Sequence, residues 1–124
     1  MKKEVQFNYR CVIINDDIKQ TDHFNTTGTI EIKGNQELWS FRHAQGMNVQ
    51  LFFDDQGVSL KQGNSILHFK HGKRKECMYQ TPYGNMALET EIESYIKTNQ
   101  GLKLVYHLYE RHACISKGYM MIRL

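Results

Sequence analysis

The sequence predicts an all-β protein, and two observations carry this prediction. Apolar and polar residues alternate with a period of two in segment after segment, which places successive side chains on opposite faces of a strand. Short polar turns separate these segments, and no stretch of 10 or more residues keeps the 3.6-residue period of a helix. Because closure of a sheet removes its exposed edges, we expect a single antiparallel up-and-down β-barrel of about eight to ten strands.

The first two expected strands are the simplest to justify. Apolar residues occupy every second position from Val5 to Ile13, and the polar residues 15–17 then turn the chain. A second strand runs over residues 28–33 and closes at Gly34-Asn35, a two-residue hairpin signal. The following alternating runs are each closed by a polar or glycine-containing turn, and they cover residues 37–43, 49–53, 58–60, 65–69 and 76–81.

The clearest half-buried strand covers residues 86–96. Strict alternation places Met86, Leu88, Thr90, Ile92, Ser94 and Ile96 on its inner face. The row Glu89, Glu91, Glu93 then lies on the outer face rather than forming an acid–base pair, which would have to converge on one buried locus. Two more strands, within residues 102–108 and 113–124, complete the barrel. The residues expected to line it are Trp39, Phe41, Leu67, Phe69, Met86, Leu88, Ile92, Leu104, Tyr106 and Leu108.

Composition limits the class of protein. A chain of 124 residues with 40% hydrophobic and 23% charged residues fits one globular domain over residues 1–124. Three cysteines without C-x-x-C spacing favour reduced thiols, and the net charge of +3 permits a nucleic-acid partner without requiring one. The longest apolar runs are a few residues, far short of the ~20 that cross a bilayer. We therefore expect a cytoplasmic protein with no membrane association.

The segment with the sequence Thr-Pro-Tyr-Gly, residues 81–84, contains the only proline. Proline and glycine explain it fully as a sharp turn. In a functional interpretation, the polar ends of tyrosine and threonine side chains lie at the mouth of the barrel and orient a small apolar or amphipathic ligand. An arginine would then bind an anionic headgroup of that ligand. The candidate ligand-binding residues are Arg42, Tyr79, Thr81, Tyr83 and Tyr106.

The densest basic cluster lies at residues 70–75 and includes Lys73, Arg74 and Lys75. Such residues contact phosphates, so they are the candidates for a nucleic-acid site. A solvated hairpin tip that resists aggregation explains the same residues.

Histidines and cysteines give two further candidates. His68 and His71 are three residues apart, and on a strand this spacing sends the side chains to opposite faces, so we expect no metal site and no cofactor. If Glu110 and Arg111 form a hairpin tip, His107 faces Cys114, where an imidazole would lower the pKa of the thiol. The sequence leaves open whether His107 and Cys114 pair. No orienting carboxylate or oxyanion hole is visible in the sequence, so no catalytic residue is assigned.

Several residues resemble the YwiB-like family of uncharacterised bacterial proteins, namely Gly72, Tyr79, Thr81, Pro82, Tyr83, Gly84, Met86 and the later segment Leu-Val-Tyr-His-Leu-Tyr. The resemblance covers roughly residues 36 to 124 and implies a lipocalin-like (calycin-type) barrel in a bacterial, cytoplasmic setting. A lipocalin G-x-W signature is missing around Trp39, so the resemblance implies no ligand transport in the manner of secreted lipocalins.

The function that the sequence favours is a non-catalytic module that binds a small apolar or amphipathic ligand in the barrel. The alternative is a fully packed barrel that serves as a protein- or RNA-interaction module. A sheet edge would also allow a homodimer.

Overall fold

The structure is a computed structural model that describes residues 1–72, 74–81 and 84–124, with the backbone alone at residues 80 and 81. Short turns join ten strands, and the described residues contain no helix, so none that could cross a membrane. The strands are β1 (Lys2–Asn15), β2 (Ile18–Lys33), β3 (Gln36–Arg42), β4 (Asn48–Asp54), β5 (Gly57–Gln62), β6 (Ser65–Lys70), β7 (Lys75–Thr81), β8 (Gly84–Thr98), β9 (Gly101–Glu110) and β10 (Ala113–Arg123). The all-β prediction is confirmed.

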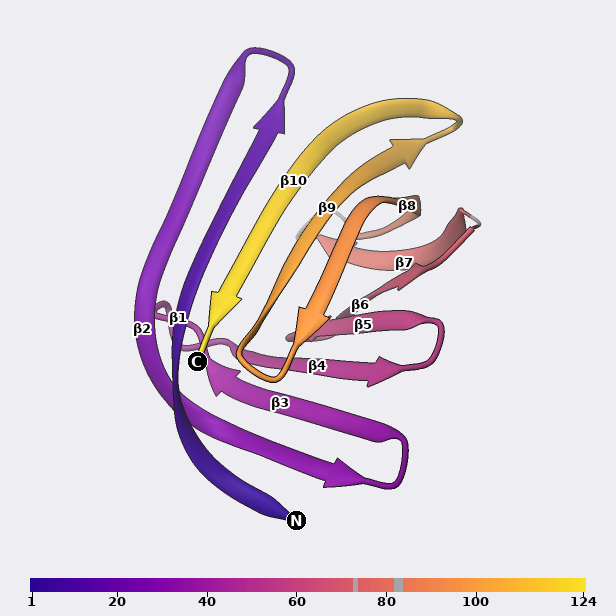
Figure 1. Ribbon diagram of the computed structural model, residues 1–124. Helices are drawn as coiled ribbons and strands as arrows, with labels where there is room; N and C mark the ends of the chain where they lie inside the picture. Colours follow the sequence, from indigo (N-terminus) through magenta and orange to yellow (C-terminus); the bar gives the residue numbers. More distant parts are fainter. Residues whose placement is uncertain (73, 82–83) are drawn as a thin grey trace.

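All ten strands form one antiparallel sheet in the order β6-β5-β4-β3-β2-β1-β10-β9-β8-β7. The sheet curls until its two edge strands, β6 and β7, lie beside each other, so the barrel is nearly closed (Figure 1). The β1–β2 hairpin is the longest in the molecule and rises beyond its neighbours at one end (Figure 1). The up-and-down topology that the turn signals predict is therefore the observed one.

The interior is filled by apolar side chains from every strand except β2's first half. Among the residues expected to line the barrel, Trp39, Phe41, Leu67, Phe69, Leu88, Leu104 and Tyr106 are buried, whereas Met86, Ile92 and Leu108 are half-buried. Aromatic rings meet in the middle, with the Phe7 centroid 5.7 Å from that of Trp39 and 5.2 Å from that of Phe41. Burial of these large rings is the main stabilising contribution to the fold.

The second half of β8 departs from strict alternation. A β-bulge shifts the register between Ile92 and Ser94, so the expectation that Ser94 and Ile96 share the inner face is wrong. One extra residue moves every later side chain to the other face. Ile96 is consequently 54% exposed, and Tyr95 and Lys97 turn inward instead.

The two residues that the bulge turns inward close one end of the barrel. Lys97 forms an ion pair with Glu37, and its Nζ lies 5.4 Å from the Trp39 ring centroid and 5.0 Å from that of Phe53. Partial burial raises the pKa of Tyr95 to about 12. A cation over aromatic rings thus caps the core at this end.

The last hairpin differs from the expected one by a single residue. Its tip is Arg111-His112, not Glu110-Arg111, and both tip residues have positive φ, 51° and 69°. Positive φ at both central positions suits the right-handed twist of a two-residue hairpin. Cys114 therefore pairs with Tyr109, and a second bulge follows between Cys114 and Ser116.

Side chains, rather than a backbone ladder, join the two edge strands. The His68 backbone N–H on β6 donates to Cys77 Sγ on β7 at 3.1 Å. The His68 carbonyl accepts a hydrogen bond from the Thr90 hydroxyl on β8. His68 on β6 thus has both its backbone N–H and its carbonyl bound by side chains, one from β7 and one from β8. We call this junction between β6 and the opposite edge of the sheet the seam.

Candidate functional site

Several hydroxyl and thiol groups lie inside the barrel where β1, β10 and β9 run side by side. The Tyr106 ring on β9 lies against Gly118 on β10, and a Cβ at Gly118 would overlap that ring. This close approach brings the Tyr106 hydroxyl near the Cys11 thiol on β1, which also lies near Tyr9. Glycine is needed here because any side chain would displace the ring.

Burial keeps these hydroxyls neutral. It is the main reason that the pKa values of Tyr9 and Tyr106 are raised, and the neighbouring Cys11 raises them further. Burial also raises the pKa of the Cys11 thiol. A thiol is a weak hydrogen-bond partner, so the two phenols retain the ability to donate to a stronger acceptor.

A further hydroxyl lies one inner position along β10 from Gly118. Ser116 is buried, pairs with Leu108 in the ladder, and its Oγ has no hydrogen-bond partner among the described residues. Two half-buried apolar side chains pack against the core in this part of the sheet, namely Ile13, which pairs with Gly118, and Leu108, which pairs with Ser116. We call Cys11, Tyr106, Ser116 and these two side chains the barrel-end group.

A histidine that sequence reasoning had placed at a strand end lies against Phe24 on β2. His43 is buried, its ring centroid is 4.6 Å from that of Phe24, and its Nδ1 accepts the Gln45 N–H at 3.1 Å. Its Nε2 therefore carries the proton and donates to Asp22. The period-two alternation through Trp39 was the signal that places His43 on the inner face.

The structure brings together only part of the predicted ligand-binding set. Tyr79 on β7 is 37% exposed and close enough to Tyr106 to help raise the pKa of its hydroxyl. Arg42 is exposed between inward-facing neighbours, so it lies on the outer face and does not join them. Thr81 ends β7 with only its backbone described, and Tyr83 lies outside the described residues.

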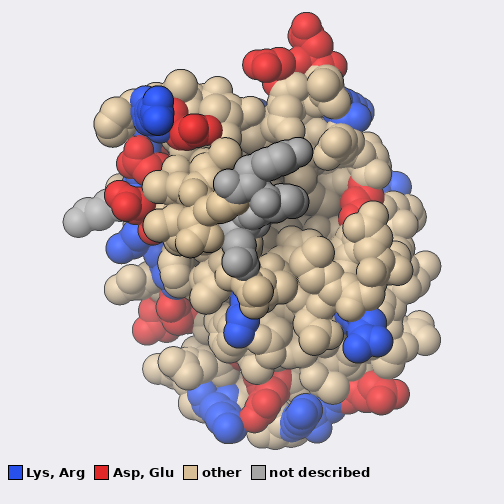
Figure 2. Space-filling model, turned by 180° about the vertical axis from the view of Figure 1, so that it is seen from behind, with Lys and Arg blue, Asp and Glu red and all other residues tan. Residues whose placement is uncertain are grey.

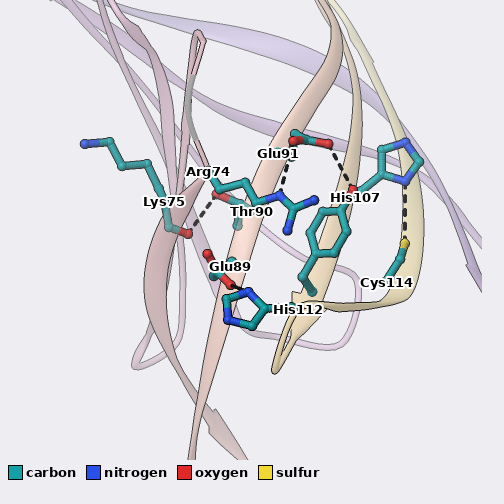
Figure 3. Close-up of polar contacts among 9 residues, drawn as sticks. Arg74, Lys75, Glu89, Thr90, Glu91, His107, His112 and Cys114 are labelled. Carbon is teal, nitrogen blue, oxygen red and sulfur yellow. Dashed lines mark hydrogen bonds and ion pairs between the residues drawn. The ribbon is translucent and has the colours of Figure 1, made fainter.

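The predicted basic cluster is partly neutralised. Arg74 Nε lies 3.3 Å from Glu91 Oε2, and its guanidinium carbon is 3.7 Å from the Tyr109 ring centroid (Figure 3). Lys75 is exposed at the start of β7, whereas Lys73 lies outside the described residues. On the face in Figure 2, basic and acidic side chains are interspersed, and the described residues seen there form no patch of one sign. This arrangement favours a solvated surface over a phosphate-binding one.

The two histidines of the H-x-x-H pair have separate partners. His68 Nδ1 lies 2.7 Å from Ser59 Oγ, and the His71 ring meets Tyr95 edge-on with centroids 5.1 Å apart. Burial lowers the pKa of His68. Within the described ranges, no three histidine, cysteine or acidic side chains are grouped as metal ligands would be.

The structure does bring His107 and Cys114 together, although they are not paired in the ladder. Cys114 Sγ is 3.7 Å from His107 Nδ1 on the outer face (Figure 3). A carboxylate that sequence reasoning missed, Glu93, lies 3.0 Å from His107 Nε2. The bulge in β8 falls at this residue, so strand periodicity gave no signal for the contact.

Comparison with known proteins agrees with the fold and with the family resemblance. The crystal structure of the YwiB protein from Bacillus subtilis superposes with a TM-score of 0.75 at 16% identity, over 98% of this chain and 92% of that chain. At this identity the likeness concerns the fold alone. No curated protein sequence matches the chain. The sequence model of a family described as "Domain of unknown function (DUF1934)" matches residues 8–122, and the chain therefore belongs to that family.

Proposed function

We propose that this protein binds a small amphipathic molecule at the barrel-end group and does no chemistry on it. The observation that carries the proposal is the buried Ser116 hydroxyl, which has no hydrogen-bond partner among the described residues. A buried polar atom without a partner costs about 1–3 kcal/mol, so a ligand oxygen that satisfies it gains affinity.

The chemistry of the neighbours indicates the class of ligand. Tyr106 is buried and its pKa is raised, so its hydroxyl stays a neutral donor. Burial penalises a charged group, so a neutral ligand oxygen is favoured over an anionic one. The half-buried Ile13 and Leu108 offer an apolar wall for the remainder of the molecule. A medium-chain alcohol or amide has both features.

Binding is tested by titration with Nile red and its displacement by 1-decanol. Tyr106→Phe removes one hydroxyl and Ser116→Ala another, and each should weaken decanol binding about five-fold, the equivalent of about 1 kcal/mol. Tyr119→Phe is the matched control, because Tyr119 is exposed on the outer face of the same strand as Ser116.

Two results would contradict the proposal. One is the absence of any displaceable probe. The other is an equal effect of Tyr106→Phe and Tyr119→Phe on decanol affinity. Native mass spectrometry of protein purified from cells adds an independent measurement, since a molecule that travels with the barrel would appear as a mass adduct lost in Ser116→Ala.

A second candidate function is self-association through the seam. The sheet ends at β6 and β7, and a groove of about 530 Å³ between them exposes Ile66 (40%) and Met78 (56%). Exposed apolar side chains beside a groove are typical of an association surface, and a two-fold axis would bring the same patch of a second copy against them, so the occupant we favour is a second copy of this chain.

Sedimentation velocity over a concentration series tests this candidate. Ile66→Lys should shift the population to monomer. Ile96→Lys, at a more exposed isoleucine on β8, should not. A wild-type protein that is monomeric at all concentrations would exclude it.

A further inference from the structure

Three outer-face side chains from neighbouring strands form a thiol, imidazole and carboxylate chain. Cys114 Sγ on β10 is 3.7 Å from His107 Nδ1 on β9, and His107 Nε2 is 3.0 Å from Glu93 Oε1 on β8. Lys117 Nζ lies 3.2 Å from the same Glu93 oxygen. We call Cys114, His107 and Glu93 the relay.

The carboxylate sets the tautomer of the imidazole. Glu93 is held ionised because hydrogen bonds from His107 and Lys117 lower its pKa. An ionised carboxylate only accepts, so His107 Nε2 carries the proton and Nδ1 presents its lone pair to the Cys114 thiol. This is the arrangement in which a histidine activates a nucleophile while a third group orients it.

Both bulges of the sheet fall within the relay. Glu93 is the extra residue of the bulge in β8, and the bulge in β10 directly follows Cys114. Without the second bulge, alternation from Lys117 would place residue 115 rather than Cys114 on the outer face beside His107. Bulges re-aim side chains and are common next to active sites. Here the bulge in β10 puts Cys114 on the same face as His107, whereas alternation from Glu91 already places Glu93 there.

The other two cysteines, Cys11 and Cys77, are buried in the interior. Cys77 is buried and accepts the His68 N–H at the seam, and Cys11 is buried among tyrosines with its pKa raised by burial. Cys114 is the one cysteine of the three that is exposed. A reactive thiol must be accessible and have a partner that takes its proton, and only Cys114 meets both requirements.

We propose that Cys114 is a site of thiol–disulfide exchange with small disulfides. The Cys114 proton passes to His107 Nδ1, and the thiolate attacks one sulfur of the disulfide R–S–S–R. The disulfide bond breaks, a mixed disulfide forms on Cys114, and the leaving thiolate takes the proton from His107 to give R–SH. The attacking sulfur is oxidised and the leaving sulfur is reduced, so no further oxidant is required. His107 is the base, and Glu93 is a positioning residue.

The experiment measures the rate at which the full-length protein reacts with 4,4'-dithiodipyridine, a neutral disulfide whose release of thiopyridone is followed by absorbance. Cys114→Ser supplies the background from Cys11 and Cys77. An unstructured peptide with the sequence of residues 110–118 supplies the intrinsic thiol rate. We expect Cys114 to react about five-fold faster than the peptide at pH 7, with the rate–pH profile displaced to lower pH.

Variants separate the relay from general surface effects. His107→Gln should bring the rate to that of the peptide and its pH profile with it. Glu93→Gln should produce a smaller shift of the profile in the same direction. The matched control is Glu89→Gln, which removes a carboxylate from the same strand and face. Glu89 pairs with Tyr109 in the ladder and has its ion pair with His112 rather than with His107. The profile should keep its wild-type position in this control.

A Cys114 rate equal to the peptide rate, or a pH profile that His107→Gln does not move, would overturn the proposal. Circular dichroism of each variant confirms that the comparison is between folded proteins. Cys114 Sγ lies 3.6 Å from the Ser116 carbonyl oxygen, but the Ser116 hydroxyl is buried and the relay lies on the outer face. Failure of ligand binding at the barrel end would therefore leave this result unaffected.

Discussion

The seam gives the most demanding prediction about stability, and it concerns Thr90. This side chain is 1% exposed, and its hydroxyl donates to the His68 carbonyl on the facing edge strand. Thr90→Val keeps the shape and removes only the donor. The net loss of one hydrogen bond costs about 1 kcal/mol, and a carbonyl left buried without its partner raises this toward about 3 kcal/mol. We expect the free energy of unfolding to fall by about 1–3 kcal/mol.

Urea denaturation monitored by Trp39 fluorescence measures this change, since Trp39 lies in the core. For a chain of this length, 1 kcal/mol corresponds to about 4 °C in Tm, so thermal unfolding should shift by about 4–12 °C. The control is Thr21→Val on the exposed face of β2. A loss below about 0.5 kcal/mol, within the range of surface substitutions, would refute the idea that side chains close the barrel.

Three more predictions follow from the core and from the bulge. Gly118→Ala should displace the buried Tyr106 ring and destabilise the protein by about 1–3 kcal/mol, measured by urea denaturation. Ile96→Lys should lower the free energy of unfolding by less than about 0.5 kcal/mol, whereas Tyr95→Lys should lower it by more, because the bulge turns Tyr95 inward and Ile96 outward. Equal losses would contradict the observed register. The pKa of Tyr95, about 12, exceeds the ~10 of an unfolded tyrosine, so the contribution of Tyr95 to stability is fully present below pH ~10 and is lost as pH rises toward 12. Tyr95→Phe should make that decline shallower in denaturation curves recorded across this range.

Much of the fold could be predicted from the sequence because strand periodicity is local. Alternation from Val5 to Ile13 and the Gly34-Asn35 turn each depend on a few adjacent residues, and both appear in the structure as predicted. The bulge at Glu93 could not be predicted, because an extra residue in one strand is defined only by the partner strand that it faces. The one-residue error at the last hairpin arose because several polar residues there fit a turn equally well, and only the pairing of the two strands selects among them.

Some features of the candidate sites could likewise be predicted from the sequence, and others could not. The place of Tyr106 in an alternating run predicted its inward orientation, and the structure also brings it near Tyr79. Arg42 was grouped with them on chemistry alone, and its position between two inward residues sends it to the other face. Nothing in the sequence connects Ser116 with an unsatisfied hydrogen bond, because that property depends on what surrounds the hydroxyl in three dimensions.

The sequence by itself therefore determined the all-β class, the strand order along the chain and most inward-facing residues, since these follow from period two and from turn chemistry. The tertiary structure alone decided which polar groups meet. It placed Cys114, His107 and Glu93 in contact from three strands, and it joined the two sheet edges through Thr90. Contacts between strands depend on register, and register is set by the packing of the whole sheet rather than by any one segment.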